Sequence, residues 1–83
     1  LMSEAIIANL NAFITREILK QPGRLLSASE KLISSGIIDS FNLVDLAVYA
    51  EDTFGVHLDD MELNADRFDT LEELAEPIAA RMG

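Results

Sequence analysis

The sequence contains no cysteine, and only six of its 83 residues are Lys or Arg. Without cysteine the chain has no disulfide framework and no thiolate metal site, so any thiol chemistry would need a cofactor. The shortage of basic residues argues against nucleic-acid binding, because the phosphate backbone requires clustered Lys and Arg. No apolar run approaches the length of a membrane span, and the first residues lack the pattern of a signal peptide. We therefore expect a cytoplasmic protein that binds neither nucleic acid nor membrane.

The acidic residues are abundant and unevenly placed. The net charge is -9; residues 1–38 carry four basic and three acidic side chains (+1), and residues 39–83 carry two basic and twelve acidic ones (-10). Acidic runs often only solvate a helix face, but they also suit basic partner surfaces. The length predicts a single domain, 1–83, that is too small for an enclosed catalytic cleft of ordinary depth. We also expect the chain to be a monomer.

The spacing of apolar residues predicts an all-α chain without strands. A first helix is expected from a cap at Ser3 to the breaker sequence at 21–23. A long connection follows to Asp39, too apolar to be a free linker, and residues 27–30 have a capping-box pattern that predicts a short helical turn.

Further helices are expected in the second half of the chain. Gly55 is expected to close the second helix, and a short acidic third helix is expected at about 60–67. Thr70 and Glu73 form a capping box that opens the last helix, in which Pro77 predicts a kink or a break.

The second helix has two distinct faces at helical spacing. One is a uniformly apolar stripe that predicts burial: Leu43, Leu46, Ala47, Ala50 and Phe54. The other interleaves apolar and acidic side chains: Phe41, Val44 and Val48 with Asp45, Glu51 and Asp52. Apolar anchors rimmed by carboxylates are typical of a transient docking surface. The alternative is that Phe41 and Val48 pack beneath a neighbouring loop or the third helix.

Ser40 follows Asp39 at the first turn of this helix, where the partly positive amide end favours an attached phosphate. A serine there is commonly an N-cap, but Asp39 can fill that role. A nucleophilic serine would need a base; the single histidine, His57, lies far along the chain, and the glycine-flanked elbow of hydrolases is absent. The carboxylates of 59–69 lack the spacing of a calcium loop, so we expect no metal site.

The segment 36–46, with the sequence Gly-Ile-Ile-Asp-Ser-Phe-Asn-Leu-Val-Asp-Leu, followed by Phe54-Gly55, resembles the core of acyl and peptidyl carrier proteins. The resemblance implies a four-helix up-down bundle with a long first connection and a short third helix. It also implies that Ser40 carries 4'-phosphopantetheine, that Asp39 assists this modification, and that the chain itself catalyses nothing. In this family the second helix is the common recognition surface, and the position of His57 lies near the arm and the partners.

The implied partners are a phosphopantetheinyl transferase, an acyl- or aminoacyl-loading ligase or adenylation enzyme, and acyltransferases or synthases with basic docking patches. Ile38 and Phe41 stand where fatty-acid carriers commonly have a small residue and Leu. This difference favours a stand-alone carrier of specialised, polyketide or nonribosomal-peptide metabolism. The alternatives are a carrier of fatty-acid synthesis and, from a different class, an acidic helical interaction module without a cofactor.

Overall fold

Three α-helices and one π-helical turn make up the regular structure of the computed structural model, which describes residues 2–59 and 61–82. In chain order these are α1 (Met2–Phe13), the π-helical turn η1 (Ile14–Ile18), α2 (Ser40–Phe54) and α3 (Leu71–Met82). The described residues include no strand, as the apolar spacing predicts.

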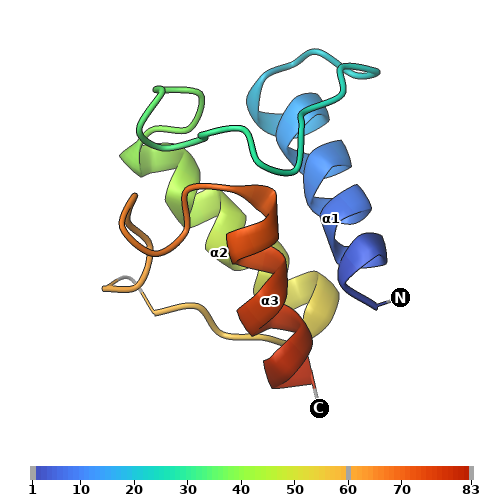
Figure 1. The fold of residues 1–83 in the computed structure, drawn as a ribbon, viewed down its shortest axis with the longest axis vertical. Helices are drawn as coiled ribbons and strands as arrows, with labels where there is room; N and C mark the ends of the chain where they lie inside the picture. Colours follow the sequence, from blue (N-terminus) through green and yellow to red (C-terminus); the bar gives the residue numbers. More distant parts are fainter. Residues whose placement is uncertain (1, 60, 83) are drawn as a thin grey trace.

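The helices enclose one apolar core. Helix α1 lies mainly against α3, and the connection between η1 and α2 passes over one end of the helices (Figure 1). Backbone hydrogen bonds from Leu32 to the Asp69 carbonyl (2.7 Å) and from Glu72 to the Ala28 carbonyl (3.2 Å) tie this connection to the start of α3. The largest fully buried side chains come from every part of the fold: Ile6, Leu10, Ile14, Leu32, Ile38, Leu46, Val56, Leu58, Leu71, Leu74 and Ile78.

The first helix begins and ends differently from the prediction. Ser3 lies inside α1 rather than capping it, and the helical segment ends at Ile18, before the breaker sequence at 21–23. The final turn widens because the Leu19 amide donates to the Ile14 carbonyl (2.8 Å), while the Thr15 hydroxyl donates to the Asn11 carbonyl (2.8 Å). The chain then reverses at Lys20, whose φ of 56° lies in the left-handed region.

The prediction of a short helical turn that starts at residues 27–30 is wrong. The Glu30 carboxylate accepts from the Ser27 amide (3.4 Å), so half of the capping box forms, but residues 27–33 contain only turns. The amides of Ile33 and Ser34, which a helix would use, instead donate to the Asp69 carboxylate.

The expected third helix, and with it the four-helix count, is not confirmed. Residues 61–67 form turns, and Asp60 lies outside the described residues. Side chains take the backbone groups that a helix would need: the Asn64 side-chain oxygen accepts from the amides of Asp66 (3.0 Å) and Arg67 (3.2 Å). The Met61 amide donates to the Asp59 carboxylate (2.9 Å), which stabilises a turn at the start of this segment.

The last helix begins where the capping box predicts. The Thr70 hydroxyl accepts from the Glu73 amide (3.1 Å), while the Glu73 carboxylate accepts from the Asp69 amide (2.8 Å) rather than from that of Thr70. The helix continues through Pro77 to Met82, so the expected break does not occur. Burial of Leu74 and Ile78 on either side outweighs the loss of one backbone hydrogen bond.

Candidate functional site

The head of α2 is closed by Asp39 and leaves Ser40 free. Asp39 is the N-cap residue; its carboxylate accepts from the Asn42 amide (2.9 Å), and the Asn42 side-chain oxygen accepts from the Asp39 amide (3.4 Å). Ser40, the first residue of the helix, is exposed, and its hydroxyl has no hydrogen-bond partner among the described residues. Asp39 therefore does the capping, and the serine hydroxyl remains available for chemistry.

Two backbone amides beside this hydroxyl also lack acceptors. The Asn42 amide is bound by Asp39 and the Leu43 amide donates to the Asp39 carbonyl (3.1 Å), whereas those of Ser40 and Phe41 have no acceptor within the described chain. Unsatisfied amides at the start of a 15-residue helix form a partly positive end that favours anions. The residues present thus fit a phosphate ester on the Ser40 oxygen.

Asp69 holds the segment that leads into the site, a role that the sequence analysis missed. Its side chain is only 5% exposed, and its two carboxylate oxygens accept from the Ile33 amide (2.7 Å), the Ser34 amide (2.9 Å) and the Ser34 hydroxyl (2.6 Å). The hydrogen bonds from Ser34, with that from Ile33, hold the pKa of Asp69 below its usual value. The approach to Asp39 and Ser40 is therefore anchored to the start of α3.

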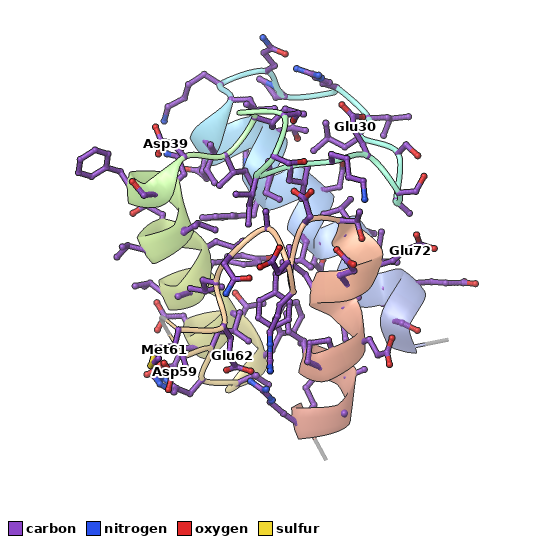
Figure 2. All side chains as sticks on the ribbon, turned by 60° about the vertical axis from the view of Figure 1, so that its left-hand side comes forward. Glu30, Asp39, Asp59, Met61, Glu62 and Glu72 are labelled. Atoms are coloured by element: carbon purple, nitrogen blue, oxygen red, sulfur yellow. The ribbon has the colours of Figure 1, made fainter. Side chains whose placement is uncertain are left out.

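A small hollow lies beside the serine. It has a volume of about 190 Å³ and is lined by Ser40, Leu43, Val44 and Leu63, so it joins the first turns of α2 to the connection before α3. Figure 2 shows Asp39 at the head of α2, with Asp59, Met61 and Glu62 gathered at the opposite end of the view. The hollow gives an apolar surface next to the Ser40 hydroxyl.

The mixed face of α2 is open to solvent. The side chains of Phe41, Val44 and Val48 are 82%, 59% and 55% exposed, so they do not pack beneath a loop. The carboxylates that were expected beside them are exposed as well: Asp45, Glu51 and Asp52. The structure thus brings the predicted apolar and acidic side chains together on the surface of one helix.

His57 lies at the end of the same face. Its Nδ1 is 3.1 Å from a carboxylate oxygen of Glu51, and both side chains are exposed. Together with Val44 and Leu58 these residues line a second hollow of about 230 Å³. The backbone around His57 is fixed from α3, because the Arg81 guanidinium donates to the His57 carbonyl (3.2 Å).

The Glu62 and Arg81 side chains form an ion pair that holds the connection between α2 and α3 against the end of α3. The guanidinium of Arg81 lies 2.5 Å from one carboxylate oxygen of Glu62 and 3.2 Å from the other. The Arg81 hydrogen bond, together with one from the Asp59 amide, lowers the pKa of Glu62 from 4.5 to about 2. The same pairing raises the pKa of Arg81.

The described residues were also searched for metal sites and for membrane-spanning helices. No group of three His, Asp or Glu side chains is placed to hold a metal ion. Within the same ranges, no helix is both long and apolar enough to cross a membrane.

Comparison with known families shows which family the chain belongs to. The family model described as "Phosphopantetheine attachment site" matches residues 13–78, which include the head of α2, its mixed face and most of α3. Comparisons with curated proteins and with solved structures returned no match. Proteins of the matched family hold 4'-phosphopantetheine covalently. The matched region covers most of the 83 residues, and the chain therefore belongs to the phosphopantetheine-binding family of acyl and peptidyl carrier proteins.

Proposed function

We propose that Ser40 is the residue that carries the phosphopantetheine arm. The observation that supports this most strongly is the free Ser40 hydroxyl beside the two unsatisfied amides of Ser40 and Phe41 at the head of α2. These amides and the helix dipole favour the negative charge that a phosphodiester brings to this position.

The attachment chemistry assigns separate roles to two neighbouring side chains. The Ser40 oxygen forms a bond to the phosphorus of the pantetheine phosphate of coenzyme A, and the bond to the adenosine bisphosphate leaving group breaks. The serine proton passes to the transferase. One carboxylate oxygen of Asp39 caps the helix, and the other has no partner in the described chain, so it can assist the transferase during this step. Once attached, the arm supplies a thiol that holds acyl or aminoacyl groups as thioesters.

The mixed face of α2 is the proposed docking surface. Exposed Phe41, Val44 and Val48 offer small apolar contacts, and three carboxylates around them attract basic enzymes. We assign this surface, with His57 at its end, to the transferase, to the enzyme that loads the cargo, and to acyltransferases or synthases that use it. Charge steers the encounter, and the modest apolar area allows each partner to leave.

The finer assignment is to specialised metabolism of the polyketide or nonribosomal-peptide type. It is supported by Ile38, which is buried in the core just before the site, and by Phe41, which projects from α2 directly after Ser40. An exposed aromatic ring next to the arm gives partners a contact that the usual Leu of fatty-acid carriers would not give. The proposed setting is the cytoplasm.

Intact mass spectrometry tests the attachment site. The protein is incubated with coenzyme A and a phosphopantetheinyl transferase of broad specificity, and one phosphopantetheine addition is expected. Ser40→Ala should abolish the addition, whereas Ser3→Ala, on an exposed position of α1, should leave it unchanged. An addition that persists in Ser40→Ala would refute the site, and no addition with several transferases would favour an interaction module without a cofactor.

A further inference from the structure

A groove opens beside the mixed face of α2, on the side of the π-helical turn. It has a volume of about 570 Å³ and is the largest of the hollows described here. Its walls come from the end of α1, from η1 and from the second half of α2: Phe13, Glu17, Ile18, Asp45, Val48, Tyr49, Asp52 and Thr53. The groove is thus distinct from the hollow at Ser40 and lies on another side of α2.

The groove exists before any partner binds, because aromatic rings fix its two walls. The rings of Phe13 and Tyr49 stack with centroids 4.2 Å apart and an angle of 18° between their planes. Tyr49 also meets Phe54 edge to face at 5.9 Å, and its hydroxyl donates to the Asn9 carbonyl (3.2 Å). These contacts bridge α1 and α2 with rigid side chains.

The widened turn of η1 shapes the part of the groove that Glu17 and Ile18 line. Its hydrogen bond from Leu19 to Ile14 skips one more residue than an α-helical turn, and it leaves Ile18 half-buried and Glu17 exposed at the groove. Glu17 makes an ion pair with Arg16 (3.4 Å), but both side chains are more than half exposed, and such pairs are weak. Glu17 therefore remains able to bind a cation.

The rim of the groove is acidic on both sides. Glu17 stands on η1, and Asp45 and Asp52 stand on α2; neither aspartate has an ion-pair partner in the ranges that the structure describes. Between them lie the apolar surfaces of Ile18 and Val48. A side chain that fills this groove therefore meets the apolar surfaces of Ile18 and Val48, the unpaired carboxylates of Asp45 and Asp52, and the weakly paired carboxylate of Glu17.

We propose that this groove binds a helical segment of a partner protein in which arginine or lysine side chains flank a leucine-sized apolar side chain. The basic groups complement Glu17, Asp45 and Asp52, and the apolar side chain packs between Ile18 and Val48. This inference rests on the docking role proposed for the mixed face of α2, and it extends that surface onto η1.

The test uses the unmodified chain, so it does not depend on Ser40 or on the arm. The probe is a short alanine-based synthetic helix with two arginines flanking one leucine, titrated into ¹⁵N-labelled protein at low salt. Amide shifts are expected at Phe13, Glu17 and Ile18 as well as on α2, including Thr53. A peptide with serine in place of leucine should bind more weakly.

Matched variants separate groove binding from overall charge. Glu17→Gln with Asp52→Asn removes two carboxylates from the rim and should weaken binding about five-fold. Glu72→Gln with Glu76→Gln removes two exposed carboxylates from α3 and should change the dissociation constant little. Circular dichroism verifies that both variants are folded. Equal weakening by the two pairs, shifts confined to the Phe41 end of α2, or no detectable binding would overturn the proposal.

Discussion

Among single residues, Asp69 ties the connection before α2 to the start of α3. It is buried and accepts three hydrogen bonds from Ile33 and Ser34, two of them from backbone amides. Asp69→Asn keeps the shape but removes the charge and turns one acceptor into a donor facing amides. We expect the free energy of unfolding to fall by about 1.5–3 kcal/mol, measured by urea denaturation.

Asp66→Asn is the control, because Asp66 is exposed and its carboxylate makes no hydrogen bond within the described residues. A loss in Asp69→Asn no larger than in this control would contradict the role of Asp69.

The pH dependence of stability follows from the same carboxylate and from Glu62. Both have pKa values held below their usual 3.8 and 4.5, that of Glu62 at about 2, so the folded state binds their protons more weakly than the unfolded state. Their contribution is therefore fully present above about pH 5 and is lost progressively as the pH falls toward 2.

Acid unfolding followed by circular dichroism measures this effect. The difference in stability between the wild-type protein and Asp69→Asn with Glu62→Gln should shrink as the pH falls below about 5. A difference that stays constant down to the acid transition would mean that neither carboxylate contributes through its charge.

The capping residues at the head of α2 were accessible from sequence, and Asp69 was not. Asp39, Ser40 and Asn42 lie within four positions of one another, so their capping geometry is local and follows from residue type and spacing. Asp69 acts on residues 35 and 36 positions earlier in the chain. Its sequence neighbours are Phe68 and Thr70, and nothing in that pattern indicates that its carboxylate is buried against a distant connection.

At the scale of the elements, α2 was predictable to its ends, because Asp39 and Gly55 are strong local signals. Gly55 closes the helix with a φ of 69°, which favours glycine. The sequence predicted a short acidic helix at about 60–67, but Asn64 and Asp59 bind backbone amides within turns. Such short polar side chains compete with the helix for backbone amides. Whether they bind those amides depends on local geometry, which the spacing of apolar residues does not report.

The uninterrupted course of α3 leads to a prediction about Pro77. A proline inside a helix removes one backbone hydrogen bond and crowds the preceding turn, yet α3 runs from Leu71 to Met82. Pro77→Ala should restore the hydrogen bond and raise the free energy of unfolding by about 1–3 kcal/mol.

Thermal denaturation measures this change, with Ala80→Gly on the exposed side of the same helix as the opposite control, expected to lower the stability by about 1 kcal/mol. A Pro77→Ala variant that is less stable than the wild type would contradict this prediction. It would mean that contacts of the proline ring with Phe68 and Arg67, which line one hollow together with Pro77, stabilise the fold more than the restored hydrogen bond does.

For the whole molecule, the placement of charge matters more than its total. Twelve of the fifteen acidic residues lie in 39–83, and those of the mixed face of α2 are exposed beside apolar side chains. A basic partner is therefore attracted toward α2 over distances comparable to the Debye length, and the attraction is screened by salt. Modification of the protein by a transferase with a basic surface should slow as the salt concentration rises.

Charge reversal locates this effect on the molecule. Asp45→Lys with Glu51→Lys should lower kcat/KM for phosphopantetheine transfer about ten-fold at low salt, mainly through KM, and should flatten the salt dependence. Glu72→Lys with Glu76→Lys makes the same change in net charge on α3 and should have a much smaller effect. Equal losses in the two variants would mean that partners respond to net charge alone, whereas a loss confined to the α2 variant identifies the mixed face as the surface that orients Ser40 toward the transferase.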